Sequence, residues 1–222
     1  MQAGARAGLW AVGAGSAVIL ALDAYAMTTG EFDLARRTIS QHGLGPGGWI
    51  FALAVVALAA GSLAIGVSLV RRRLAAALSL GMLALLLWCA ALVTVAWFPK
   101  HDWTVGPSMS GTIHRIASVV AFASLPVAAL LLTRPWWRRP AARVAALLGL
   151  ASLLWVAGIT AVIVHAGLNG LAWWRVMPLG LVERGLAVTE VATVLALGAW
   201  AALHPGRPAR VIPPRVRVGQ EG

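Results

Sequence analysis

The sequence predicts an all-α polytopic membrane protein, a bundle of six transmembrane helices with both termini in the cytoplasm. Three observations lead to this fold class. Apolar residues make up 60% of the 222 residues and charged residues only 11%, whereas soluble domains contain about half and a quarter. The apolar residues form six runs long enough to cross a bilayer, which takes about 20 residues. The cations cluster in short segments between these runs.

The six runs define the expected spans of one transmembrane domain, residues 1–204. We place the spans at about residues 8–27, 49–70, 74–98, 113–132, 144–166 and 182–203. The second and third spans contain no charged residue. The remaining residues, 205–222, are rich in Pro and Arg. Because such a composition cannot bury an apolar core, we expect a disordered basic tail in the cytoplasm.

The orientation follows from the distribution of cations. Most of the 18 Lys and Arg residues fall on one side of the alternating spans, at Arg6, Arg71, Arg72, Arg73, Arg134, Arg138, Arg139, Arg143 and in the tail. Short loops rich in Lys and Arg stay in the cytoplasm. We therefore expect a multi-pass protein of the cell (plasma) membrane with cytoplasmic termini.

The N-terminus also allows a second interpretation. Arg6, the apolar run after it and the segment Ala24-Tyr25-Ala26 are similar to a signal peptide with its cleavage site of small residues. Cleavage would leave five helices without changing the side on which any later loop lies. Both interpretations predict a membrane protein.

The net charge of +11 does not indicate nucleic-acid binding. Proteins that bind nucleic acid gather their cations on one face or along one helix, whereas these cations lie in clusters between apolar runs. We expect membrane lipids as partners and no nucleic acid.

Polar chemistry gathers towards the outer side of the predicted bundle. Several ionisable side chains lie inside the spans near their outer ends, and five of them matter here: Asp23, His114, His165, Arg184 and Glu190. An ionisable group inside a membrane costs a few kcal/mol unless it faces the bundle interior or water. We expect these five to line one cavity that opens to the outer leaflet. If the fourth and fifth helices pack as a hairpin, the two histidines lie at similar depth.

The order of several short segments resembles a known family. Ile39-Ser40-Gln41-His42-Gly43 follows the first span, Phe98-Pro99 with Asp102 ends the third, and Glu183-Arg184 opens the sixth. This order resembles DUF998 (domain of unknown function 998), a family of six-helix membrane proteins, and more remotely the Frag/DRAM/Sfk group. The resemblance implies a compact six-helix protein without an established activity. The positions that match its pattern are Ser40, Pro99, Asp102, His114, Glu183 and Arg184.

The favoured function is binding of a lipid headgroup or small amphiphile in the outer cavity. The candidate ligand-binding residues are Arg184, His114, Asp23, Glu183, Glu190, Ser40 and Asp102. Arg184 could hold a phosphate or carboxylate through its planar fork of donors, or it could form an ion pair with Asp23 or Glu190. Both alternatives stay open at this stage.

An intramembrane hydrolase or acyl transferase acting on lipid-linked substrates is the second hypothesis. Its catalytic candidates are His114, Glu190 and Asp23. A divalent metal would take ligands from His114, His165 and either Asp102 or Glu190, because zinc enzymes use three protein ligands and one open position. The sequence itself requires no cofactor. Ser40 with His42 is a further nucleophile–base candidate. A proton-coupled transporter that uses Asp23 and Glu190 is the third hypothesis, and the absence of an inverted sequence repeat counts against it.

Overall fold

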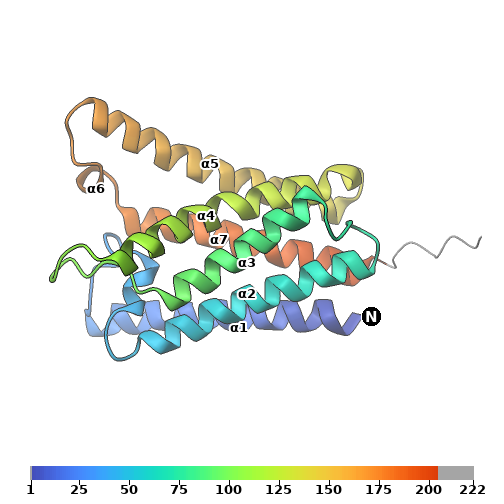
Figure 1. Cartoon of the computed structure of the whole chain (residues 1–222), viewed down its shortest axis with the longest axis horizontal. Helices are drawn as coiled ribbons and strands as arrows, with labels where there is room; N and C mark the ends of the chain where they lie inside the picture. The colour runs from blue at the N-terminus through green and yellow to red at the C-terminus, as the bar shows by residue number, and fades with distance from the viewer. Residues whose placement is uncertain (1, 205–222) are drawn as a thin grey trace, which may run out of the picture.

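Six long helices dominate the computed structural model, which describes residues 2–204 (Figure 1). They are α1 (Gln2–Thr29), α2 (Gly48–Arg71), α3 (Leu80–Trp97), α4 (Met109–Thr133), α5 (Pro140–Leu168) and α7 (Leu179–Leu203). Three short helices join them: η1 (Ile39–Gly43), η2 (Arg134–Trp136) and α6 (Trp173–Val176). Every regular element within the described range is helical, so the prediction of an all-α protein with six long apolar helices is confirmed. The predicted tail, residues 205–222, lies outside the described residues.

The surface of the bundle is apolar where a soluble protein would be polar. All six long helices have the length and composition to cross a membrane. Large apolar side chains in the middle of four of them point outward, including Leu20, Val119, Leu154 and Val188, each more than 60% exposed. Large exposed apolar surfaces mark contact with lipid or with other proteins. The chain is therefore a multi-pass membrane protein.

Two helices begin at serine caps instead of at the limits of the apolar runs. The Ser79 hydroxyl accepts a hydrogen bond from the Met82 amide, at 3.4 Å, so α3 starts six residues later than expected. The Ser108 hydroxyl accepts from the Gly111 amide, at 3.0 Å, so α4 starts earlier than expected. A serine at this position satisfies an amide that the helix leaves without an internal partner.

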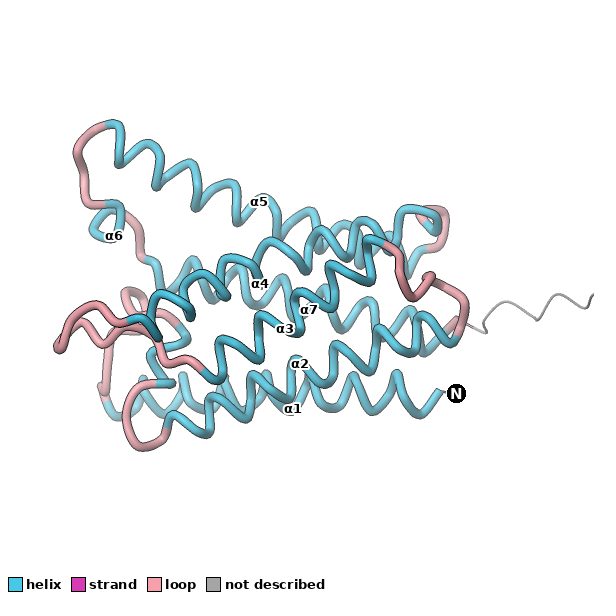
Figure 2. Tube along the Cα trace, viewed as in Figure 1, coloured by secondary structure: helices cyan, strands magenta, loops and turns pink. Residues whose placement is uncertain are grey.

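Glycines allow α1 and α2 to lie directly against each other (Figure 2). A Cβ atom added at Gly61 would lie 2.7 Å from the Gly8 carbonyl oxygen and 2.8 Å from a methyl group of Val12. Such distances are shorter than any real Cβ contact, so only glycine fits there. Small residues at helix contacts let the backbones approach closely in membranes. These contacts lie within one copy of the chain.

The second half of the α5 helix departs from its neighbours. It packs against α7 where the Trp155 ring covers Gly185 and the Ser152 hydroxyl donates to the Thr189 hydroxyl, at 3.1 Å. Beyond this contact α5 leans away from α4 and α7 (Figures 1 and 2). His165, near the far end of α5, is exposed, whereas His114 is buried. α5 also packs against α4 at Gly149, next to Ala129 and Pro126, so the two helices are neighbours as predicted, but the two histidines have different surroundings.

Candidate functional site

A short segment of the first loop, residues 38–43, lies at the centre of the bundle end that the sequence predicts to face outward. We call this segment the outer hub. It contains η1 and lies where α1, α2, α7 and the loop after α3 meet. The Lys100 ammonium donates to the Thr38 hydroxyl, at 2.7 Å, and to the Gln41 side-chain oxygen, at 3.3 Å. The Glu183 carboxylate receives a hydrogen bond from the Ile39 amide. A side chain from α7 thus binds the backbone of the hub, and one from the α3–α4 loop binds two of its side chains.

An ion pair between the first and last long helices, α1 and α7, lies next to the hub and contacts it through His42. The guanidinium of Arg184 binds Asp23 through two hydrogen bonds, Nε to Oδ2 at 2.8 Å and Nη2 to Oδ1 at 2.7 Å. His42 Nε2 lies 2.8 Å from the same Oδ1 atom. Both side chains of the ion pair are largely shielded, with 13% and 15% exposure. Bidentate pairing of this kind is the strongest arrangement of Arg with a carboxylate.

The remaining donor group of Arg184 is also occupied. Its Nη1 atom donates to the backbone carbonyls of Leu34, Arg37 and Gly180, at 2.8–3.0 Å. Of the two alternatives that the sequence left open, the structure therefore favours the ion pair with Asp23. Arg184 ties the start of α7 to the first loop, and it has no nitrogen left without a partner for a phosphate.

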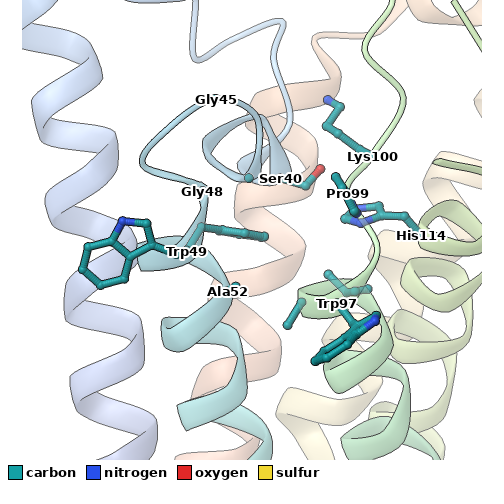
Figure 3. A pocket seen from close by; sticks show the side chains of 13 residues that line it. Ser40, Gly45, Gly48, Trp49, Ala52, Trp97, Pro99, Lys100 and His114 are labelled. Atoms are coloured by element: carbon teal, nitrogen blue, oxygen red, sulfur yellow. The ribbon is translucent and has the colours of Figure 1, made fainter. Parts of the chain in front are cut away.

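A pocket of about 260 Å³ lies between the outer hub, α2 and the end of α3 (Figure 3). Its polar side contains the side chains of Ser40 and His114. Its apolar side is formed by Phe51, Ala52, Val95 and Ala96, and the remaining lining residues are Gly43, Gly45, Gly48, Trp49, Trp97, Pro99 and Lys100. Trp49 and Trp97 are 64% and 79% exposed. Tryptophans prefer the level of the lipid headgroups, which places the pocket at the edge of the membrane.

The His114 ring is held in one orientation at the start of α4. Its Nδ1 atom lies 2.7 Å from the Phe98 carbonyl oxygen. Because a carbonyl oxygen can only accept, Nδ1 carries the proton of this bond, and Nε2 of the neutral ring carries the lone pair. His114 is 5% exposed and its side chain reaches the pocket (Figure 3). The pocket thus contains an imidazole ring held in a fixed orientation.

Ser40 and Lys100 lie on the same side of the pocket as His114 (Figure 3). The Ser40 hydroxyl lies 3.1 Å from the Thr38 hydroxyl, which in turn accepts from Lys100. Burial lowers the pKa of the Lys100 ammonium, and the nearby Glu183 carboxylate opposes this shift. A chain of hydrogen bonds therefore connects a cation to the hydroxyl at the pocket.

The other predicted site residues lie elsewhere. Glu190 is 1% exposed, and neither of its carboxylate oxygens has a hydrogen-bond partner within residues 2–204. One oxygen of Glu183 is likewise buried without a partner in that range. Asp102 lies in a turn after α3, where two hydrogen bonds from Thr104 hold its pKa below the usual value. The five ionisable residues expected in a single cavity are thus distributed over the ion pair, the pocket, the protein interior and the exposed end of α5.

The proposed metal ligands do not converge. His114 faces the pocket, His165 is exposed at the end of α5, and Asp102 binds Thr104. In the part of the chain that the structure describes, no three His, Cys, Asp or Glu side chains come close enough to hold a metal ion. The geometry therefore does not support a divalent metal held by these three residues.

Sequence reasoning omitted Lys100, Trp49, Trp97 and the glycine segment 43–48 from the candidate site. The available signal was position: Lys100 follows the third span directly, and Trp49 opens the second. These residues reach the pocket because the first loop folds back over the end of α3, which the sequence pattern does not indicate.

Comparison with known proteins places this architecture in a family. A family model described as "Protein of unknown function (DUF998)" matches residues 11–200. The chain belongs to the DUF998 family. The match covers the outer hub, the Asp23–Arg184 pair and all residues that line the pocket of this DUF998 protein. No curated protein and no solved structure matches the chain.

Proposed function

We propose that this DUF998 protein binds the headgroup and linkage region of a membrane lipid or small amphiphile in its outer pocket. The observation that carries the proposal is the division of the pocket into two sides. Ser40 and His114 offer polar groups on one side, while Phe51, Val95 and Ala96 offer apolar surface on the other. An amphiphile needs both, because ligand pockets combine apolar walls with a few placed polar groups.

The position of the pocket supports a ligand that comes from the membrane. The two exposed tryptophans flank it on α2 and α3, at the level where polar headgroups meet hydrocarbon. Lys100 adds a positive charge beside the polar side. A negatively charged or strongly polar headgroup would therefore be held near the hub, with its chain passing down between α2 and α3.

Filling the pocket tests the proposal. We expect Ala52→Trp, on the pocket side of α2, to remove lipid that co-purifies in mild detergent and to abolish binding of a fluorescent phospholipid. Ala60→Trp is the matched control, because Ala60 lies on the same helix but is exposed outside the pocket. Equal lipid content and equal phospholipid affinity in the two folded variants would contradict the proposal.

We also propose that the pocket faces the outside of the plasma membrane and that both termini are cytoplasmic. The excess of Lys and Arg in the N-terminal segment, the α2–α3 loop and the α4–α5 loop supports this orientation. The test replaces Cys89 by Ala and introduces single cysteines at Ser108 and Arg138. A membrane-impermeant maleimide applied to whole cells should label only the cysteine at position 108. Labelling of both, or of position 138 alone, would contradict the orientation.

A further inference from the structure

We propose that Ser40 and His114 form a nucleophile–base pair that removes the acyl group from an ester-linked membrane amphiphile. This inference rests on the proposed binding function of the same pocket and adds a reaction to it. Ser40 is also the nucleophile that the sequence suggested, but the base that we propose for it is a different histidine. His42, expected to be the base, binds Asp23 instead, at 2.8 Å, whereas His114 lines the pocket together with Ser40 (Figure 3).

The first requirement of such a pair is a base with a free lone pair in a fixed position. The His114 ring meets the positional part of it, because Nδ1 donates to the Phe98 carbonyl, at 2.7 Å, and the Val95 carbonyl also interacts with the ring. With the proton of the neutral ring on Nδ1, Nε2 is the nitrogen that can accept a proton. In serine hydrolases a carboxylate usually orients the ring in this way. Here a backbone carbonyl does so.

The second requirement is a hydroxyl group that loses its proton readily. Lys100 donates to the Thr38 hydroxyl, at 2.7 Å. That hydroxyl can in turn donate a hydrogen bond to Ser40 Oγ, 3.1 Å away. A hydrogen bond received from a donor that is itself bound to a cation favours the charged form of an oxygen. Ser40 Oγ therefore accepts from the hub side, and its own proton is free to point into the pocket.

The third requirement is access for an ester. Ser40 and His114 are not hydrogen-bonded to each other in the described part of the chain, and the pocket of about 260 Å³ extends beside both. Catalytic hydrogen bonds often tighten only when the substrate is bound. The flanking tryptophans place this polar side at the membrane interface, which is also the level of the ester linkages of lipids.

The reaction balances without any cofactor. Ser40 Oγ attacks the ester carbonyl carbon, and its proton moves to His114 Nε2. The bond between that carbon and the leaving alcohol then breaks, and the alcohol oxygen takes the proton from His114. Water, or the hydroxyl of a second amphiphile, attacks acyl-Ser40 with His114 again as the base. The products are the alcohol and either a carboxylic acid or a new ester.

An alkyl fluorophosphonate, which forms a covalent bond with activated serines, provides the test. The full chain in mild detergent should gain one phosphonyl group, and peptide mass mapping should place it on Ser40. We expect no labelling in Ser40→Ala. In His114→Gln, whose amide can still donate to the Phe98 carbonyl, we expect labelling at least about 100-fold slower and without the loss of rate at acidic pH that an imidazole base causes.

Ser110→Ala is the matched control, because the Ser110 hydroxyl lies on the same outer side but donates to the Pro99 carbonyl, at 2.9 Å, and does not line the pocket. It should be labelled like the wild type. A wild-type protein that elutes as a folded species and binds the fluorescent phospholipid, yet is not labelled at Ser40, would overturn the reaction and leave the binding function intact. Labelling of Ser40 at an unchanged rate in His114→Gln would overturn the role of His114. If the folded wild type does not bind the fluorescent phospholipid, the result would instead contradict the proposed binding function.

Discussion

The ion pair between Asp23 and Arg184 gives the clearest quantitative prediction. The two residues are 161 positions apart in the sequence, and both side chains are shielded from water, with 13% and 15% exposure. Removing one partner of a shielded pair leaves an uncompensated charge, which costs roughly 3–5 kcal/mol. Because some exposure remains, we expect about 3 kcal/mol for Asp23→Asn or Arg184→Gln. For a protein of this size, that corresponds to a loss of roughly 6–12 °C in the melting temperature.

The double variant separates a specific pair from two independent contributions. If the two residues act as one unit, the second substitution removes a charge that the first has already left without its partner. Asp23→Asn/Arg184→Gln should then lose about as much stability as either single variant, with a coupling energy of about 2–3 kcal/mol.

Thermal unfolding in mild detergent, followed by tryptophan fluorescence, measures all four proteins of the cycle. Arg115→Gln is the control for loss of a cation, because Arg115 is exposed on α4, and its melting temperature should change by less than about 2 °C. Losses that add within about 0.5 kcal/mol would refute the reasoning, because additivity is the behaviour of independent sites.

Three further predictions concern stability and pH, each measured by thermal unfolding in the same detergent. Gly8→Ala should lower the free energy of unfolding by about 1–3 kcal/mol, because a Cβ at Gly8 would lie 2.7 Å from the Gly61 carbonyl oxygen. Gly13→Ala is the control and should not destabilise the protein, because nothing lies within 4 Å of its Cβ position. Equal losses of stability in the two variants would contradict the packing of α1 on α2. Glu190→Met should raise stability by about 1–3 kcal/mol, because it replaces a buried carboxyl without partners by an apolar side chain; a decrease would mean that Glu190 has a partner. Burial lowers the pKa of Lys100 from 10.5, so the unfolded chain holds this proton more tightly than the folded protein. The wild type should therefore gain stability relative to Lys100→Met as the pH rises from the lowered pKa to about 10.5. A stability difference that does not depend on pH would contradict the lowered pKa.

The helices could be predicted from the sequence because the signals for them are local. Length and hydrophobicity determine whether a segment can cross a membrane, and both can be read within each apolar run. The starts of α3 and α4 differ from the prediction by several residues. A single serine cap, at Ser79 or Ser108, determines where each helix begins and outweighs the apolar pattern there.

The candidate site could be predicted only in part. His114 was identified because ionisable residues inside the spans are few, and Ser40 because its segment resembles the family pattern. The ion pair of Arg184 with Asp23 was one of the alternatives that the sequence offered. The other three acceptors of Arg184 could not be predicted, because they are backbone carbonyls, which any residue supplies. Glu190 was expected in a cavity because the sequence gives its depth in the membrane but not the side of α7 on which the bundle packs. His165 was misplaced because nothing in the α5 sequence marks where the helix departs from its neighbours.

The bond between Asp23 and Arg184 also orders events during synthesis. Asp23 enters the membrane with the first helix, whereas its partner lies in the last one and reaches the bilayer only after some 161 further residues have been added. Until then the first loop lacks the guanidinium that binds the Leu34 and Arg37 carbonyls. Insertion of α7 is therefore the step that closes this bond, and a nascent chain that stops before it keeps a carboxyl group in its first helix without the arginine that binds it.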